Sequence, residues 1–480
     1  MSADRVYYGC HTCFAIHINK DCHKKLRCLV FLATADSIGA MEVEAMKSNV
    51  SETGQQEMKH AATKKWDVAV IGGGPAGLAA AALAAQGGCS VVLLEGTKHY
   101  GGRSASTEAD GAVFNLGAHA LYRKGAAERV LERLGVRPHG KAPTMNISWL
   151  IDQDTAVSTM GLLLGGKLGW MEKRQLIGCL VRIRRMQPEA AAGKSWRQQL
   201  IELGVAGRAR DIMEGMGRLG TYAGDADKLD AGAAIMQLQK AVMYPDGGWQ
   251  SMIDAMVERA QAAGAQLLTK SAVTDVTRLE DSWTLTHNGG VVHARQIIAA
   301  VSPAKLNDWF GPHLPASYAR SLSALTPMTA ACLDVHLRRL PHSTGLFTLG
   351  AQQPLYLSVH SRWANLTQQQ GHAVVHTMRY HTGEAADQEE DRLLLEKLLD
   401  RMQPGWRKEV VRQRYLPRLV VSHASPTTEL RGVLNRPSVL TGVPGVYAAG
   451  DWAGNEGHLL DAALASGEEA AQLVLKHHTN

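Results

Sequence analysis

The chain is poor in aromatic residues, has few cysteines for its length and contains no long apolar run. Aromatic side chains make up 5% of the 480 residues, which does not favour a binding site walled densely by aromatic rings. No segment approaches the roughly 18 consecutive apolar residues typical of a membrane-spanning helix. The 51 lysines and arginines are dispersed without a long basic, aromatic-rich tract, so the formal charge of +6 does not indicate a nucleic-acid partner.

The seven cysteines are too unevenly spread for a disulfide framework. An odd and scattered set favours a reducing compartment, and we expect a cytoplasmic protein. The amino-terminal group includes a CHTC motif and nearby histidines that could ligate zinc. Because no second CxxC follows, we predict no metal site, and a zinc-binding protein is a distant alternative. The cysteines are Cys10, Cys13, Cys22 and Cys28 near the amino terminus, then Cys89, Cys179 and Cys332.

Residues 1–65 differ in character from the rest of the chain, and we expect a disordered extension there. Residues 42–65 are polar and resemble a linker. Residues 24–35 have a basic start and a short apolar run, but they lie too far from Met1 for a signal peptide. Several methionines precede the first predicted strand, so the sequence leaves open whether the extension belongs to the functional protein.

The most informative segment is residues 66–103, which combines a glycine-rich turn with two apolar runs. A buried strand is predicted over 68–71, followed by an alanine-rich helix over about 75–85. A second apolar strand is predicted over 91–94. The order strand, turn, helix and strand is the context in which a glycine motif binds a dinucleotide.

Three glycines follow the first predicted strand at GxGxxG spacing. Gly72 permits a tight turn, Gly74 lets the backbone approach a pyrophosphate, and Gly77 lets the helix pack closely on the strand. Free N–H groups at the start of the helix favour phosphate. Glu95 ends the second strand, where a carboxylate can accept hydrogen bonds from a ribose 2′-hydroxyl.

The same spacing recurs at Gly215, Gly217 and Gly220, where it predicts no dinucleotide site. The preceding residues 210–214 are mostly charged and do not resemble a buried strand. No evident helix begins after the third glycine. Because GxGxxG is a weak signal outside its structural context, we assign nucleotide binding to the first motif alone.

Two further segments carry residues suited to a nucleotide cofactor. Gly102 allows a close backbone approach, and Arg103 could neutralise a phosphate. Gly450 and Asp451 end a predicted strand, at the sheet edge where α/β proteins bind ligands. A carboxylate there could bond ribityl hydroxyls, and a helix starting near Leu459 would direct its positive end toward a flavin ring.

The order of the predicted elements indicates an α/β fold with a Rossmann-like nucleotide-binding domain. Helical patterns alternate with groups of half-buried strands further along the chain. We expect the nucleotide-binding domain to be assembled from three segments and interrupted by a mixed α+β substrate domain. The nucleotide-binding segments are 66–125, 244–305 and 416–480, and the substrate-domain segments are 126–243 and 306–415.

The motif GGGPAG at 72–77, GGR at 101–103 and AAGDWAGNEGHLLDAALASGEEAA at 448–471 resemble the FAD-dependent amine oxidase superfamily. That group includes flavin amine oxidases, protoporphyrinogen oxidases and phytoene desaturases. The resemblance runs from about residue 66 to the carboxyl terminus and is specific for FAD rather than for a substrate. It implies FAD as the cofactor, held by Gly72, Gly74, Pro75, Ala76, Gly77, Glu95, Gly102, Arg103, Gly117, Val273, Gly450, Asp451 and Leu459.

The chain also departs from this group at the expected catalytic positions. Amine oxidases present a lysine near flavin N5, and no lysine can be assigned to that role here, so the catalytic residues are unassigned. Trp452 follows Asp451, but a single tryptophan is more often a packing residue than the wall of an aromatic cage. His119 could act as an acid or a base near the flavin, although a structural histidine is the commoner case.

The resemblance implies an oxidoreductase that transfers hydride from a small, hydrophobic substrate to flavin N5, with C–C desaturation favoured. A flavin amine oxidase using oxygen is the first alternative. A redox-neutral flavin isomerase or a non-catalytic FAD-binding protein is the second. No further nucleotide motif indicates a nicotinamide, so we expect oxygen, a quinone or another electron acceptor. A peripheral membrane contact and the oligomeric state are left open.

We predict that Glu95→Ala weakens the retention of FAD. A hydrogen bond from ribose to a charged group typically contributes about 1.5–3 kcal/mol, which the alanine would remove. Titration of the apoprotein with FAD measures the change. An unchanged affinity would contradict the assignment of Glu95.

Overall fold

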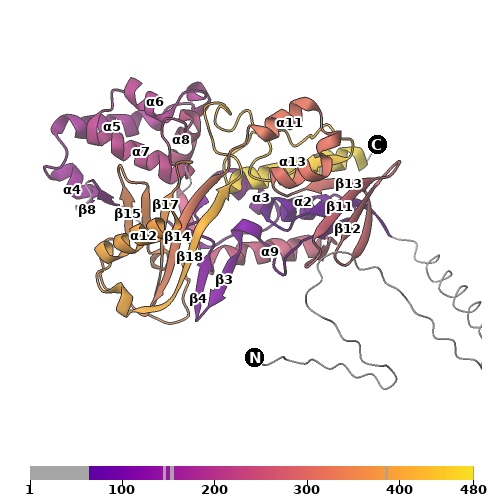
Figure 1. The fold of residues 1–480 in the computed structure, drawn as a ribbon, viewed down its shortest axis with the longest axis horizontal. Coiled ribbons are helices and arrows are strands. Elements are labelled where there is room, and N and C mark those ends of the chain that lie inside the picture. Colours follow the sequence, from indigo (N-terminus) through magenta and orange to yellow (C-terminus); the bar gives the residue numbers. More distant parts are fainter. Residues whose placement is uncertain (1–63, 144–146, 152–155, 384–386, 479–480) are drawn as a thin grey trace, which may run out of the picture. The chain divides into compact units, whose positions relative to one another are not determined.

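Two seven-stranded sheets dominate the part of the chain that the structure describes (Figure 1). This computed structural model describes residues 64–143, 147–151, 156–383 and 387–478. A two-stranded and a three-stranded sheet complete the described strands. The expectations for the amino-terminal extension, including those for its cysteines and histidines, lie outside these residues.

The first sheet joins strands from three distant stretches of the chain. Its order is β10-β2-β1-β13-β12-β11, and β19 pairs with β13. Strands β1, β2, β10, β13 and β19 run parallel, whereas β11, β12 and β13 form an antiparallel meander. The bounds are Lys65–Ile71 for β1, Val91–Leu94 for β2, Gln266–Leu268 for β10, Val273–Arg278 for β11, Trp283–His287 for β12, Gly290–Ala299 for β13 and Val446–Ala448 for β19.

The parallel register aligns the carboxyl ends of these strands at one edge. Ile71 of β1 lies opposite both Leu94 of β2 and Ala299 of β13. Ala299 in turn lies opposite Ala448 of β19. The glycine turn after β1, the carboxylate after β2 and the Gly-Asp pair after β19 therefore converge at the edge where parallel sheets bind ligands.

Helix α2, Pro75–Gln86, is buried throughout residues 76–85. A helix that is apolar on all sides is stable only when neighbouring elements bury every face of it. It packs against β1 and β2 of the sheet and against α9, Gly248–Ala262, and α13, Leu460–His478. Gly467 of α13 sits against the backbone of α2, where a Cβ atom would collide with the carbonyl oxygen of Ala76. This glycine therefore sets the close approach of the two helices.

The second sheet has the order β18-β14-β17-β16-β15-β7-β8. All neighbouring pairs for which the register is defined are antiparallel except β15 with β7. Helix α12, Gln388–Met402, packs on β14 and β17 through a buried leucine face. The strands span Ser148–Leu150 (β7), Ala156–Ser158 (β8), Met328–Leu337 (β14), Phe347–Gly350 (β15), Leu355–Ser358 (β16), Ala373–Tyr380 (β17) and Val410–Ser422 (β18).

A cluster of helices packs around α7, Gly207–Thr221, beside the β15 end of the second sheet (Figure 1). All three glycines of the second GxGxxG match lie inside this helix, which confirms that no strand–turn–helix unit forms there. Gly215 faces Trp149 of β7, and Gly217 faces the indole of Trp196. These glycines admit large neighbouring side chains rather than a nucleotide. The other helices of the cluster are α4, Thr159–Leu164, α5, Trp170–Ile183, α6, Trp196–Glu202, and α8, Ala231–Leu238.

Most predicted elements are present with small changes in their bounds. The strands predicted over 68–71 and 91–94 and the alanine-rich helix are confirmed as β1, β2 and α2. None of the described helices is long and apolar enough to cross a membrane. The remaining elements are β3, Ser106–Ala109, β4, Ala112–Asn115, β5, Leu121–Tyr122, β6, Gly140–Lys141, β9, Val242–Pro245, α3, Ala126–Arg133, α10, Pro303–Phe310, and α11, Ala316–Ser323.

The division into two domains stays a proposal. The predicted boundary at 243/244 lies inside β9, and the boundary at 415/416 lies inside β18. Strand β18 pairs with β14 along most of its length, so its residues belong with the second sheet. We propose that the chain passes between the two sheets at the ends of these strands.

We predict opposite stability effects for two glycine-to-alanine substitutions in helices. Gly467→Ala places a Cβ atom against the backbone of α2, and overpacking of this kind costs about 1–3 kcal/mol. Gly178→Ala in α5 faces open space, and its gain in helix propensity is about 1 kcal/mol. The midpoint of urea unfolding should fall for the first variant and stay level or rise for the second. Equal shifts in the same direction would contradict the close approach of α13 to α2.

Candidate functional site

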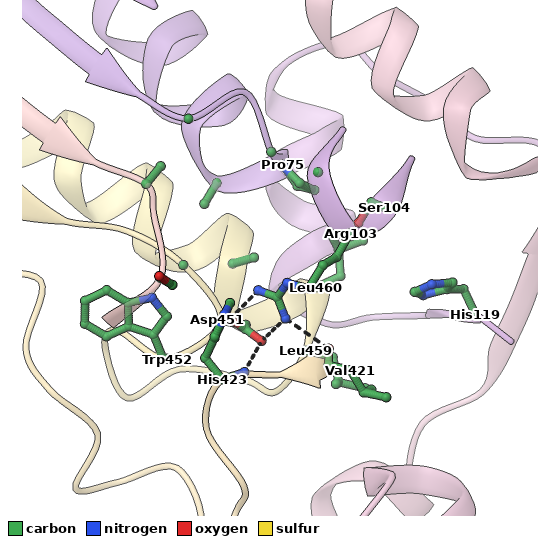
Figure 2. A pocket seen from close by; sticks show the side chains of 18 of the residues that line it. Pro75, Arg103, Ser104, His119, Val421, His423, Asp451, Trp452, Leu459 and Leu460 are labelled. Carbon is green, nitrogen blue, oxygen red and sulfur yellow. Dashed lines mark hydrogen bonds and ion pairs between the residues drawn. The ribbon is translucent and has the colours of Figure 1, made fainter. Parts of the chain in front are cut away.

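A cavity of about 340 Å³ lies at the carboxyl edge of the first sheet (Figure 2). It is bounded by the chain segments that follow β1, β2, β13 and β19, and by the starts of α2 and α13. Ten of the thirteen predicted cofactor residues line it, which brings together segments that are far apart in the sequence. The lining comprises Gly72, Gly74, Pro75, Ala76, Glu95, Gly102, Arg103, Ser104, His119, Ala120, Tyr122, Tyr222, Trp249, Ala300, Val301, Ser302, Val421, His423, Gly450, Asp451, Trp452, Leu459, Leu460 and Ala463.

The glycine turn after β1 forms one wall of this cavity. Gly72 has φ +106°, and a Cβ atom there would collide with the carbonyl oxygen of Ala300. At Gly74 a Cβ atom would meet nothing within 4 Å, so the backbone borders open space. No side chain caps the amino end of α2, which leaves its first N–H groups available to a ligand. The positive end of the helix dipole favours an anion at this position.

Glu95 fastens the glycine turn to the end of β2. One carboxylate oxygen accepts a hydrogen bond from the N–H of Gly73 at 2.7 Å, and the other accepts one from the N–H of Thr97 at 2.8 Å. The side chain is 9% exposed. Glu95 is thus a structural link between the two segments. It can still accept a hydrogen bond from a ribose, because each carboxylate oxygen has a further lone pair.

Arg103 and Asp451 form a two-pronged ion pair across the cavity wall (Figure 2). Both N–O distances are 2.7 Å, and Arg103 also donates to the carbonyl oxygen of Val421 at 3.0 Å. Burial opposes ionisation of Asp451, but the Arg103 guanidinium and His423 outweigh it and hold the pKa of this carboxyl well below its usual range. The sequence suggested separate roles for the two residues, a phosphate contact and a ribityl contact. The structure shows that the two residues form an ion pair with each other.

Arg436 holds the loop between Asp451 and α13, and sequence reasoning missed it. Its guanidinium is 7% exposed and donates to the carbonyl oxygens of Asp451, Gly454, Glu456 and Gly457. Burial lowers the pKa of Arg436 to about 10, with Asp451 opposing the shift. An arginine that satisfies four carbonyl groups fixes the path by which the chain reaches the start of α13.

A second cavity of about 150 Å³ adjoins the first and shares His119, Ala120, Tyr122 and Tyr222 with it. Five of the chain's 11 tyrosines line this second cavity, together with Phe347. The low overall aromatic content therefore conceals a local concentration, which composition alone could not reveal. The lining residues are His119, Ala120, Tyr122, Pro143, Ile147, Met216, Leu219, Gly220, Tyr222, Gln237, Leu238, Lys240, Val242, Tyr244, Phe347, Tyr356, Met378 and Tyr380.

Two polar atoms of the tyrosine-lined cavity lack hydrogen-bond partners within the described protein. These are Oε1 of Gln237 and the hydroxyl of Tyr380, and each side chain belongs to a residue that is 2% exposed. By contrast, Tyr122 donates to the carbonyl of Gly220 and Tyr222 to the carbonyl of Ala118, each at 2.7 Å. A buried polar group without a partner is costly, so Gln237 and Tyr380 are suited to bonding a ligand.

His119 lies where the two cavities meet. Its Nε2 lies 2.6 Å from the carbonyl oxygen of Leu116, which requires Nε2 to carry the proton and leaves Nδ1 as an acceptor. Burial lowers the pKa of His119 to about 4, so the imidazole is neutral at pH 7. Its ring centroid lies 5.0 Å from that of Trp249, whose buried indole N–H has no hydrogen-bond partner among the described residues.

Three of the predicted cofactor residues, Gly77, Gly117 and Val273, do not line the larger cavity. Gly77 packs against the carbonyl of Gly72, Gly117 has φ +84° beside Leu419, and Val273 begins β11. Trp452 is completely buried and donates its indole N–H to the carbonyl of Val301 at 2.9 Å. Because Trp452 also borders the larger cavity, its packing role stays a prediction.

Comparison with known proteins identifies the family. Residues 75–475 match the model for flavin containing amine oxidoreductases. A Mycobacterium tuberculosis protein assigned as a flavin-containing monoamine oxidase is 27% identical over 282 residues, which is 52% of this chain and 60% of that protein. The carotenoid 3,4-desaturase of Haloarcula japonica is 39% identical over 72 residues, 15% of this chain and 14% of that enzyme.

The same fold occurs in putrescine oxidase solved with bound putrescine. That structure covers 86% of this chain and 100% of its own, with a TM-score of 0.67 and 18% identity. At this identity the likeness concerns the fold alone. The family match nevertheless spans most of the chain. The chain therefore belongs to the flavin-containing amine oxidoreductase family, and the cofactor that this membership implies is FAD.

Proposed function

We propose that the protein is an FAD-dependent oxidoreductase that takes hydride from a small, hydrophobic and uncharged substrate, with desaturation of a C–C bond as the favoured reaction. The observation that carries this proposal is the pair of connected cavities, one beside the glycine turn and one lined by tyrosines. The first has the features of a nucleotide site, and the second is a smaller, mostly apolar space beside it. Such a junction suits a flavin ring with a substrate against one face.

The residues of the larger cavity fit FAD. The open space at Gly74 suits the close approach of a pyrophosphate, and the uncapped start of α2 supplies N–H groups and a positive dipole end. Glu95 has lone pairs for a ribose, while Gly102, Arg103, Gly450, Asp451 and Leu459 border the remaining length of the cavity. When bound, FAD supplies the acceptor for the hydride.

Because Arg103 is paired with Asp451, we propose that the positive charge that stabilises the pyrophosphate comes from another group. Because the guanidinium is already compensated by a buried carboxylate, it offers little net positive charge to a phosphate. We therefore assign stabilisation of the pyrophosphate to the start of α2 rather than to Arg103. The ion pair instead holds the segment after β2 against the segment after β19. It thereby fixes the distance between these two walls of the cavity.

The polar groups around the tyrosine-lined cavity favour a neutral substrate over an ammonium ion. No aspartate or glutamate is among its described lining residues. Lys240 lines it, paired with Asp461 at 2.6 Å, and the buried guanidinium of Arg218 lies 5.9 Å from the ring of Tyr380. Asp461 compensates the charge of Lys240, so the buried guanidinium of Arg218 is the group that disfavours a positively charged guest. Gln237 and Tyr380 can form hydrogen bonds with a neutral substrate, and most of the other lining residues are apolar.

A flavin amine oxidase using oxygen is the second candidate. Likeness to known proteins favours this function, because one similar protein is named as a flavin-containing monoamine oxidase and another as putrescine oxidase. The substrate would have to enter as the neutral amine, since no described carboxylate in the lining balances its charge. A redox-neutral flavin isomerase and a non-catalytic FAD-binding protein would differ from both in consuming no electron acceptor.

His119 lies in a position to accept a proton from the substrate. Desaturation breaks two C–H bonds, and one hydrogen leaves as hydride while the other leaves as a proton that needs a base. His119 borders both cavities, is neutral, and has Nδ1 available as an acceptor. We propose that His119 accepts this proton. The alternative is that His119 has a structural role only.

We expect anaerobic mixing with a hydrophobic isoprenoid-type or porphyrinogen-type substrate to bleach the flavin absorbance, whereas protonated amines leave it unchanged. The physical reason is the absence of a described carboxylate from the tyrosine-lined cavity. Gln237→Leu should bind FAD normally and react about tenfold more slowly through loss of one substrate hydrogen bond. Tyr318→Phe, which removes a hydroxyl far from this cavity in α11, is the matched control. Bleaching by amines alone would establish the second candidate instead.

The pH dependence of turnover should carry the signature of His119. Because its pKa is lowered to about 4, the neutral base persists as the pH falls below 6 and is lost only near pH 4. The plot of kcat/KM against pH should therefore be flat from neutral pH down to about 5 and fall below that. His119→Asn should abolish this acidic limb and lower kcat with FAD still bound. An acidic limb near 6.5, or one that persists in the variant, would contradict the role.

A further inference from the structure

Exposed apolar side chains gather on α4 and α5. In the ribbon these two helices lie on the side of the helix cluster that is far from the first sheet (Figure 1). Seven of the fourteen exposed large apolar side chains among the described residues fall between 160 and 181. Apolar groups scattered singly over a surface need no explanation, whereas a contiguous group marks an interaction site. The group, here called the α4–α5 patch, comprises Met160 57%, Leu164 78%, Trp170 69%, Met171 54%, Ile177 53%, Leu180 36% and Val181 49% exposed.

The helical repeat explains why α5 has two apolar faces. Leu176, Cys179 and Ile183 are its buried residues, and α5 packs on α7. Trp170, Ile177 and Val181 follow the spacing of a separate stripe on the opposite side of a 3.6-residue helix. One face therefore accounts for folding, and nothing within the described chain covers the other.

The α4–α5 patch is also basic. Arg174, Arg184 and Arg185 are exposed and form no ion pair with any described residue. The only acidic residue within α5, Glu172, accepts hydrogen bonds from the N–H groups of Gly169 and Arg208. Two copies of a patch with unpaired arginines would repel each other. The charge pattern therefore favours an anionic surface over a second copy of this chain.

An apolar cavity of about 150 Å³ lies directly beneath the patch. Leu180 both lines this cavity and is 36% exposed in the patch. Ile147 and Met216 are shared between this cavity and the tyrosine-lined cavity. Thr159 is the one polar side chain in the described lining. Apolar surface thus continues from the patch inward to the cavity in which the substrate is proposed to react.

We propose that the α4–α5 patch docks on an anionic lipid bilayer, with the apolar cavity beneath it admitting a lipophilic substrate from the membrane. Tryptophan, leucine and methionine would enter the interface while the arginines meet lipid phosphates, as in helices that lie in the plane of a membrane. The docking stands on the surface alone. The delivery of substrate rests on the proposed function.

Flotation with vesicles tests the docking, using the full chain and no substrate. Vesicles of phosphatidylcholine mixed with phosphatidylglycerol should retain the protein, and pure phosphatidylcholine should retain much less. A triple variant Leu164→Ser, Trp170→Ser, Ile177→Ser should lose at least about tenfold in partition coefficient. A second variant, Arg174→Gln, Arg184→Gln, Arg185→Gln, should lose a comparable amount and remove the dependence on salt.

Matched controls change exposed residues outside the patch. Leu279, Val291 and Leu440 are 47%, 49% and 51% exposed, and their replacement by serine should leave partitioning unchanged. Arg320→Gln with Arg418→Gln is the control for charge. Equal binding by wild type and both patch variants would overturn the proposal. So would a dimer in solution that the apolar variant dissociates, because the patch would then be an interface between copies.

The delivery step has its own readout. Both patch variants should bleach as fast as wild type with substrate in detergent micelles, and more slowly with substrate embedded in anionic vesicles. Equal rates from vesicles would overturn delivery while leaving docking intact. If wild type floats with the vesicles but no lipophilic substrate bleaches the flavin in either form, the proposed function fails and the docking surface stands.

Discussion

The parallel register of the first sheet is the constraint on which the candidate site depends. β1, β2, β13 and β19 end opposite one another, so four loops from different parts of the chain leave the sheet at one edge. The glycine turn, Glu95, the residues after Ala299 and the Gly-Asp pair acquire a common location from backbone pairing alone. Side chains then refine a cavity whose position the sheet has already determined.

Charges in this cavity are compensated in pairs, which shapes what it can bind. Arg103 and Asp451 compensate each other, so neither offers a free charge to a ligand. Arg436, which does not line the cavity, donates to backbone carbonyl groups. The uncompensated polarity lies instead in the backbone N–H groups at the start of α2. An enclosed site built this way supplies a phosphate with dipoles, which carry a smaller desolvation cost than a buried unpaired cation.

In the described part of the chain three cavities adjoin one another, and charged side chains line the first two but not the third. The larger cavity borders glycine backbone and an ion pair, the next is lined by tyrosines, and the third is lined almost entirely by aliphatic side chains below α4 and α5. His119 stands at the first junction, and Ile147 and Met216 stand at the second. This arrangement is consistent with a polar cofactor entering beside the charged residues and a hydrophobic substrate entering from the apolar third cavity.

The sequence by itself determined the local unit of strand, turn, helix and acid, because its information lies within some thirty residues and glycine has few alternatives there. It also identified Gly450 and Asp451 by their place after a strand. It did not reveal that Arg103 pairs with Asp451 or that Arg436 secures the following loop. Nor did it reveal that tyrosines from β5, β9, β16 and β17 share one cavity with Tyr222, which follows α7. Those contacts join residues far apart in the chain, and only the packing of the two sheets and the helix cluster decides which side chains meet.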